Sequence, residues 1–83
     1  MAKIQEVAMD FMSRNDCNFY AIDLNFELKF FGYPFHPESI WYSEKEDKIY
    51  LHGGNEEFEG DINIDSLSES NQSILEKALK TRI

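Results

Sequence analysis

The chain has 83 residues, a formal net charge of −8 and one cysteine. This length supports one modest hydrophobic core, so we expect a single domain over residues 1–83. Hydrophobic residues make up 42% and charged residues 29%, as in soluble globular proteins, and no apolar run is long enough to cross a bilayer. Cys17 has no second cysteine to pair with, and the first residues lack the apolar run of a signal peptide. We therefore expect a cytoplasmic protein.

The negative charge is concentrated in one part of the chain. Residues 38–69 contain ten acidic and two basic residues, a net charge of −8, whereas residues 1–37 sum to −2 and residues 70–83 to +2. An anionic segment is repelled by nucleic acid and by anionic membranes, which excludes both as direct partners. The charge distribution favours a protein partner with a basic surface.

The first predicted element is an amphipathic helix over residues 3–13. Its apolar residues recur at spacings of three and four, which places them on one helical stripe. These residues are Ile4, Val7, Ala8, Phe11 and Met12. We expect Asn15 to cap the C-terminal end of the helix.

The next element is a long strand over residues 20–30. Large apolar side chains occupy every even position, and polar side chains occupy the odd positions from Asp23 to Lys29. This period of two is typical of a strand with one buried face. Because no glycine or proline interrupts it, we expect one continuous strand, strongly twisted or bulged, that pairs with more than one neighbour.

A loop rich in aromatic residues is predicted over residues 31–37, because two prolines and a glycine fall within it. Six of the twelve aromatic residues of the chain lie between Phe30 and Tyr42. These rings either cover one end of the core or form an exposed contact patch, and the sequence leaves both open. The contact patch would include Phe31, Tyr33 and Phe35.

Residues 39–44 and 48–52 are predicted to form a hairpin with its tip at residues 45–47. The alternation turns Trp41 and Tyr50 to the outer face, where they can form a cross-strand aromatic pair. Gly53 and Gly54 are expected in a flexible turn. A last strand contains Phe58, Ile62 and Ile64, with Gly60 as a bulge or a point of close approach.

A second helix is predicted over residues 67–80, with Ser66 or Ser68 as its N-cap and Ser66 and Glu69 as a capping box. Its buried stripe would contain Leu67, Ile74, Leu75, Ala78 and Leu79. The predicted class is therefore α+β: two layers, with an antiparallel meander of three or four strands and both terminal helices on one face. The other face of the sheet is left to solvent and is the place to look for function.

Neither catalysis nor metal binding has a clear motif in this sequence. Cys17, His36 and His52 are the best catalytic candidates, but nothing in their spacing brings a thiol and an imidazole together. The segment from Asp61 resembles the start of an EF-hand loop, yet it has Ser66 where glycine is needed and Gln72 where glutamate is needed. We expect no catalytic residues, no metal site and no cofactor.

The strongest functional signal is a surface that combines carboxylates with aromatic side chains. We expect Glu57, Glu59 and Asp61 to form a row beside Trp41 and Tyr50, because residues two apart on a strand share a face. Aromatic anchors surrounded by charge are typical of protein-binding sites. The predicted partner-binding residues are Phe31, Tyr33, Phe35, Trp41, Glu44, Glu46, Asp47, Tyr50, Glu56, Glu57, Glu59 and Asp61.

These patterns predict a small acidic binding protein that is not an enzyme and acts by protein–protein interaction. Its most specific form is an inhibitor, of the phage anti-defence or immunity type, whose carboxylates imitate nucleic acid and occupy a basic, nucleic-acid-binding surface of the target. The alternative is a domain that binds a small ligand or a metal, in which a homodimer forms through the aromatic surface. A purely solubilising role for the acidic face also stays open.

Overall fold

The computed structural model describes residues 4–21, 27–30 and 33–81. In chain order the elements are helix α1 (Ile4–Arg14), strands β1 (Phe19–Ala21), β2 (Leu28–Phe30), β3 (Tyr33–Ser43), β4 (Lys48–Gly54) and β5 (Glu59–Asn63), the short 3-10 helix η1 (Ile64–Ser66) and helix α2 (Glu69–Lys80). All strand pairs are antiparallel. The predicted α+β class, with an antiparallel sheet and a helix at each end of the chain, is confirmed.

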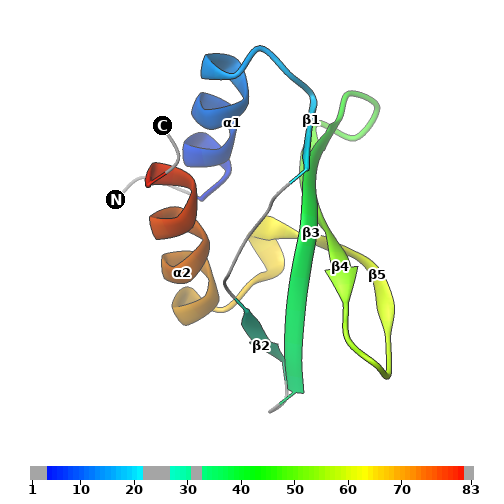
Figure 1. Ribbon diagram of the computed structural model, residues 1–83. Coiled ribbons are helices and arrows are strands. Elements are labelled where there is room, and N and C mark those ends of the chain that lie inside the picture. The colour runs from blue at the N-terminus through cyan, green and yellow to red at the C-terminus, as the bar shows by residue number, and fades with distance from the viewer. Residues whose placement is uncertain (1–3, 22–26, 31–32, 82–83) are drawn as a thin grey trace.

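The sheet has the strand order β1-β3-β4-β5, and β2 also pairs with β3. Figure 1 shows both helices on one face of this sheet, with β1 and β2 on the edge of β3 that faces away from β4. The Cα radius of gyration is 11.9 Å, close to the value of about 12 Å expected for a folded chain of this length. Among the described residues, no helix has the length and apolar character needed to span a membrane.

The described residues of the long strand predicted over residues 20–30 belong to two short strands. Tyr20 pairs with Ile40 in β1, and Leu28 pairs with Phe35 in β2. In one regular antiparallel ladder, the same number of residues separates two positions and their two partners. Leu28 lies seven residues from Ala21, but their partners Phe35 and Ser39 lie only four residues apart, so one regular ladder is excluded. The alternation holds where it can be followed, since Leu28 is buried while Glu27 and Lys29 are exposed. Ile22, Leu24 and Phe26 lie outside the described residues.

The loop predicted over residues 31–37 is wrong from Tyr33 onward, because β3 begins there. A proline is tolerated in a strand where its missing N–H is not needed for the ladder, at an edge or beside a bulge. Pro34 precedes the stretch that pairs with β4, and Pro37 lies at a shift of register between the two strands. Phe31 and Gly32 lie outside the described residues.

The register shift between Pro37 and Ser39 leaves Glu38 without a partner on β4. Phe35 and Pro37 are buried at odd positions before the shift, and Ile40 is buried at an even position after it. Glu38 itself is exposed. The irregularity therefore changes which residues of β3 face the core, from odd-numbered positions before it to even-numbered positions after it. Glu38, at the irregularity, faces the outer side.

Gly53 and Gly54, predicted as a turn, are instead the last two residues of β4. A Cβ atom at Gly53 would lie 2.2 Å from the carbonyl oxygen of His36, and one at Gly54 would lie 2.2 Å from that of Phe58. The close approach predicted at Gly60 is therefore found on the neighbouring strand. The nearest atom to a Cβ at Gly60 would be a ring carbon of Phe58 at 3.4 Å, an ordinary contact.

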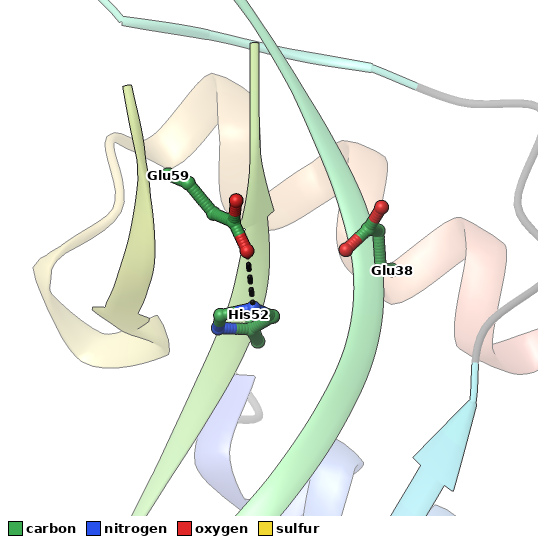
Figure 2. Close-up of side chains that lie close together, drawn as sticks. All are labelled: Glu38, His52 and Glu59. Carbon is green, nitrogen blue, oxygen red and sulfur yellow. Dashed lines mark hydrogen bonds and ion pairs between the residues drawn. The ribbon is translucent and has the colours of Figure 1, made fainter.

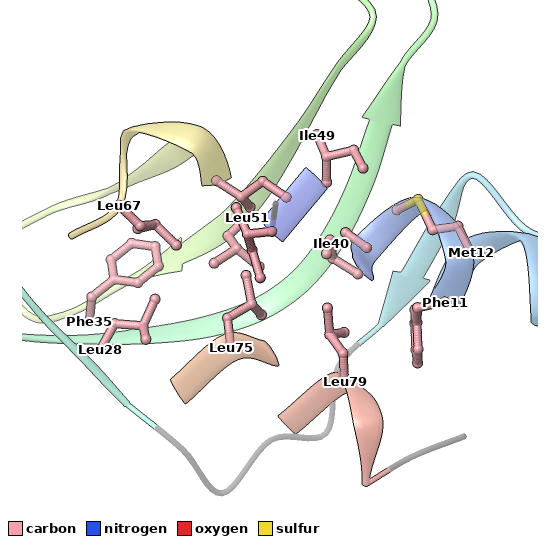
Figure 3. Close-up of a cluster of buried hydrophobic side chains, with 13 residues drawn as sticks. Phe11, Met12, Leu28, Phe35, Ile40, Ile49, Leu51, Leu67, Leu75 and Leu79 are labelled. Carbon is pink, nitrogen blue, oxygen red and sulfur yellow. The ribbon is translucent and has the colours of Figure 1, made fainter. Parts of the chain in front are cut away.

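The core lies between the sheet and the two helices (Figure 3). Its buried apolar residues are Ile4, Ala8, Phe11, Met12, Leu28, Phe35, Ile40, Ile49, Leu51, Ile64, Leu67, Leu75 and Leu79.

Helix α2 differs from its prediction in two ways. Ser68 is the N-cap and accepts from the N–H of Asn71, so the capping box on Ser66 is wrong. Ile74 is 38% exposed, and the polar Asn71 is buried in the stripe instead.

Candidate functional site

The candidate site is the face of the sheet that the helices leave uncovered (Figure 1). The rings of Trp41 and Tyr50 stack there across β3 and β4, with ring centroids 4.9 Å apart and planes inclined by 21°. The two residues are direct partners in the ladder, as the hairpin prediction requires. Phe19 pairs with Trp41 from the other side and is 61% exposed. Aromatic residues therefore form a row across three strands at one end of this face.

Carboxylates from β5 lie beside that row. Asp61 accepts a hydrogen bond from the indole Nε1 of Trp41 at 2.9 Å. Its same oxygen, Oδ1, lies 3.2 Å from Nδ1 of His52, and Oε1 of Glu59 lies 3.2 Å from Nε2 of the same ring. The register explains this contact, because His52 pairs with Asp61 while Glu59 lies two residues away on the same strand face.

Glu38 completes this group from β3. Figure 2 shows the carboxylate of Glu59 directed at the ring of His52, with Glu38 on the adjacent strand. Glu38, His52 and Glu59 each offer one metal-ligating atom, and these atoms all lie within 4.8 Å of one another. Among the residues that the structure describes on this face, these three could hold a metal ion.

The carboxylates change the titration of His52. Desolvation lowers its pKa, but hydrogen bonds to Glu59 and Asp61 and the negative charges of both outweigh that effect. The pKa of His52 therefore lies above its ordinary value of 6.5. When protonated, His52 reduces the negative charge at the centre of the outer face.

The acidic residues of the hairpin turn are divided between the two faces. Glu46 accepts a hydrogen bond from the hydroxyl of Tyr50, and this bond, followed by burial and nearby negative charge, raises the pKa of Tyr50. Asp47 instead accepts from the hydroxyl of Tyr42 at 2.7 Å, and its carbonyl accepts from Gln5 of α1. Because Tyr42 packs against the core and Gln5 belongs to α1, Asp47 is held on the helix side of the turn rather than beside the Trp41–Tyr50 pair. Glu44 is exposed in the same turn.

The row predicted for Glu57, Glu59 and Asp61 is reduced to Glu59 and Asp61. Glu57 precedes β5, and its N–H donates to the side chain of Asn55, which shapes the turn. An Asn side chain commonly bonds the backbone two residues further on, so Asn55 and Glu57 form a tight turn by themselves. Glu57 therefore belongs to a different part of the surface.

That second part is an apolar groove of about 840 Å³ at the other end of the sheet. It is lined by Tyr33, Pro34, Phe35, Asn55, Glu57, Phe58, Ile62 and Ser66. Tyr33 is 62% exposed and Phe58 48% exposed. Phe35 is only 1% exposed, so its prediction as a contact residue is wrong: as an inward position of β3, it joins the core. Glu56 is exposed beside the groove, and Phe31 lies outside the described residues.

The remaining candidates are separated in space. Cys17 lines a shallow hollow at the end of α1 with Met9, Met12 and Tyr42, and neither histidine contributes to it. Nε2 of His36 lies 3.9 Å from a carboxylate oxygen of Glu27, and His36 lies outside the hollow of Cys17. The EF-hand-like segment is not a loop, since Asp61 belongs to β5 and Asn63 caps η1 through the N–H of Asp65.

Sequence reasoning missed the contacts of His52 with Glu59 and Asp61 and its proximity to Glu38. The alternation of β4 and β5 places His52, Glu59 and Asp61 on the same face as Tyr50, so the sequence holds a signal for these three residues. No sequence signal marks Glu38, whose outward direction depends on the irregularity in β3.

Comparison of the chain with protein-family models, with curated proteins and with solved structures finds no match.

Proposed function

We propose that this protein acts by binding a basic surface of another protein through the outer face of its sheet, without catalysing a reaction. The observation that carries this proposal is the stacked pair Trp41–Tyr50, held at the surface between carboxylates of β5 and of the hairpin turn. Large aromatic residues at the centre of a contact with charge around them are typical energetic anchors of protein interfaces.

The charge of this face favours a basic partner. The carboxylates of Glu46 and Asp61 accept hydrogen bonds from the aromatic pair, and that of Glu59 lies beside His52 on the same face. Residues 38–69 hold the net negative charge of the chain. Complementary charge raises the rate of association and selects among partners. The most specific form of the proposal is an inhibitor that competes with nucleic acid for a basic groove. We place it in the cytoplasm, since its one cysteine suits a reducing compartment.

The proposal is tested by capturing a partner on the immobilised chain and measuring its affinity for variants. Trp41→Ala should weaken binding by about 2 kcal/mol or more, as the loss of a buried anchor does. Ile74→Ala is the matched control, because Ile74 is a partly exposed apolar residue on α2, away from the outer face. Equal affinity of the parent and a folded Trp41→Ala variant would exclude this face as the binding site.

The inhibitor form has its own test. Glu59→Gln combined with Asp61→Asn should slow association, while Glu6→Gln, an exposed acid on α1, should leave the rate unchanged. The partner's nucleic acid should compete with the chain for binding. Simultaneous binding of both would reject the nucleic-acid mimic and leave the binding function in place.

A further inference from the structure

A mixed nitrogen and oxygen cluster lies at the centre of the outer face, outside the aromatic pair. Glu38 projects from β3, His52 from β4 and Glu59 from β5 (Figure 2). We propose that these three residues form a binding site for a divalent transition-metal ion, with Zn²⁺ as the best match. This site goes beyond the proposed partner binding and does not depend on it.

The distances suit a metal of this size. With Zn–N and Zn–O bonds of about 2.0–2.2 Å, the ligand atoms of a tetrahedral site lie about 3.3 Å apart. Nε2 of His52 and Oε1 of Glu59 are already 3.2 Å apart. The whole set lies within 4.8 Å, so Glu38 has to approach by at most about 1.5 Å, which rotation of an exposed side chain supplies.

A second feature separates this site from a simple cluster of acids. Asp61 lies 3.2 Å from Nδ1 of His52 and is itself held by the indole N–H of Trp41. A carboxylate on the far nitrogen is the usual partner of a metal-bound histidine, because it fixes the proton there and orients the ring. It directs the lone pair of Nε2 toward the position between the two glutamates.

The backbone of three neighbouring strands positions the proposed ligand residues. Glu38 faces outward because of the register shift in β3, while His52 and Glu59 are held by the β4–β5 ladder. Sites built on paired strands are more rigid than sites on loops. A hollow of about 300 Å³, lined by His36, Glu38, Gly54, Asn55 and Glu59, opens beside the carboxylates. It provides room for an ion with water as a further ligand.

The ligand set selects the class of ion. An imidazole with two carboxylates suits Zn²⁺ and its transition-metal neighbours, whereas Ca²⁺ and Mg²⁺ prefer oxygen ligands alone. Three protein ligands leave one tetrahedral position open, where water or a group of a binding partner can coordinate.

The test is a calorimetric titration of the full chain with ZnCl₂, in a Cys17→Ser background so that the thiol cannot bind zinc. We expect saturable binding of one ion per chain and no comparable binding of Mg²⁺. His52→Ala, Glu38→Gln and Glu59→Gln should each weaken the affinity by about 10-fold or more, and Asp61→Asn, which changes the orienting carboxylate, by about 10-fold.

Matched controls use the same residue types outside the cluster. Glu44→Gln and Glu57→Gln, which replace exposed glutamates away from the ligands and the hollow, should bind Zn²⁺ as the background does. In the NMR spectrum of the unsubstituted protein, Zn²⁺ should shift the ring resonances of His52, a readout that needs no variant to fold. The proposal is overturned if the protein shows no saturable Zn²⁺ binding, or if the control variants lose as much affinity for Zn²⁺ as the ligand variants. It is also overturned if Glu38→Gln and Glu59→Gln bind Zn²⁺ as tightly as the background.

Discussion

Gly53 and Gly54 show how single residues set the distance between neighbouring strands. In each case the missing side chain allows a carbonyl oxygen, of His36 or of Phe58, to lie where a Cβ atom would otherwise be. The reason is space rather than an unusual backbone angle. Because both contacts are with backbone atoms, a larger residue could be accommodated only by moving a strand.

Replacing Gly53 by alanine should therefore destabilise the protein by about 1–3 kcal/mol, the usual cost of overpacking. Gly60→Ala is the control, since a Cβ there would meet only the side chain of Phe58 at 3.4 Å. Denaturant unfolding of both variants measures the difference. A Gly53→Ala variant as stable as Gly60→Ala would show that β3 and β4 can separate at this point without cost.

Tyr42 and Asp47 give a residue-scale prediction about pH. The hydrogen bond to Asp47, followed by burial and the charges of Asp47 and Glu44, raises the pKa of Tyr42 above 10.0. A raised folded-state pKa means that the stabilisation is complete below the unfolded value and is lost as pH rises through the folded value. Ultraviolet titration of the protein, minus that of Tyr42→Phe, should show a phenol that ionises above pH 10, and Asp47→Asn should lower its pKa.

At the scale of elements, Asn71 connects α2 to the edge strand β2. Its side chain donates to the carbonyl of Lys29 at 2.9 Å and accepts from the N–H of Lys29 at 3.3 Å. It is 5% exposed, in the middle of an otherwise apolar stripe. A helix side chain thus replaces the neighbouring strand that β2 lacks on this side, which protects an edge that could otherwise pair with another chain.

Asn71→Ala should destabilise the protein by about 1–3 kcal/mol, because it leaves backbone groups of Lys29 without partners. Ser73→Ala, an exposed position on the same helix, is the control and should have little effect. Thermal unfolding and amide exchange of Lys29 measure the result. If exchange at Lys29 is unchanged in Asn71→Ala, the side chain does not protect the strand edge.

At the scale of the whole molecule, the sheet separates the core from the face that we propose binds a partner. The face toward the helices carries the core, and the opposite face carries the aromatic pair, the carboxylates and His52. Phe11 and Phe19 illustrate the division, since Phe11 is fully buried and Phe19 is 61% exposed beside Trp41.

Phe11→Ala should cost about 3–5 kcal/mol of stability, as other large-to-small changes in cores do. Phe19→Ala should change stability by less than about 0.5 kcal/mol, the range for surface substitutions. Chemical denaturation of the two variants provides the comparison. A large loss in Phe19→Ala would show that this ring supports the fold, and that it cannot be used as a probe of binding alone.

The sequence by itself determined the local elements and the class of fold. The stripe of α1, the hairpin and the pairing of Trp41 with Tyr50 follow from periodicity, because side-chain direction repeats every 3.6 residues in a helix and every two in a strand. The same alternation identified the outer face, and the composition showed where its negative charge lies. These features depend on neighbours in the chain, which a sequence displays directly.

Only the tertiary structure decided where the alternation breaks and what meets across the sheet. The parity change in β3, which buries Phe35 and exposes Glu38, depends on the register against β4. The meeting of Glu38, His52 and Glu59, and the contact of Asn71 with Lys29, join residues from different elements. Such contacts depend on how strands align and how a helix lies over an edge. A one-residue change in register reverses every side chain that follows it, so local pattern alone cannot fix them.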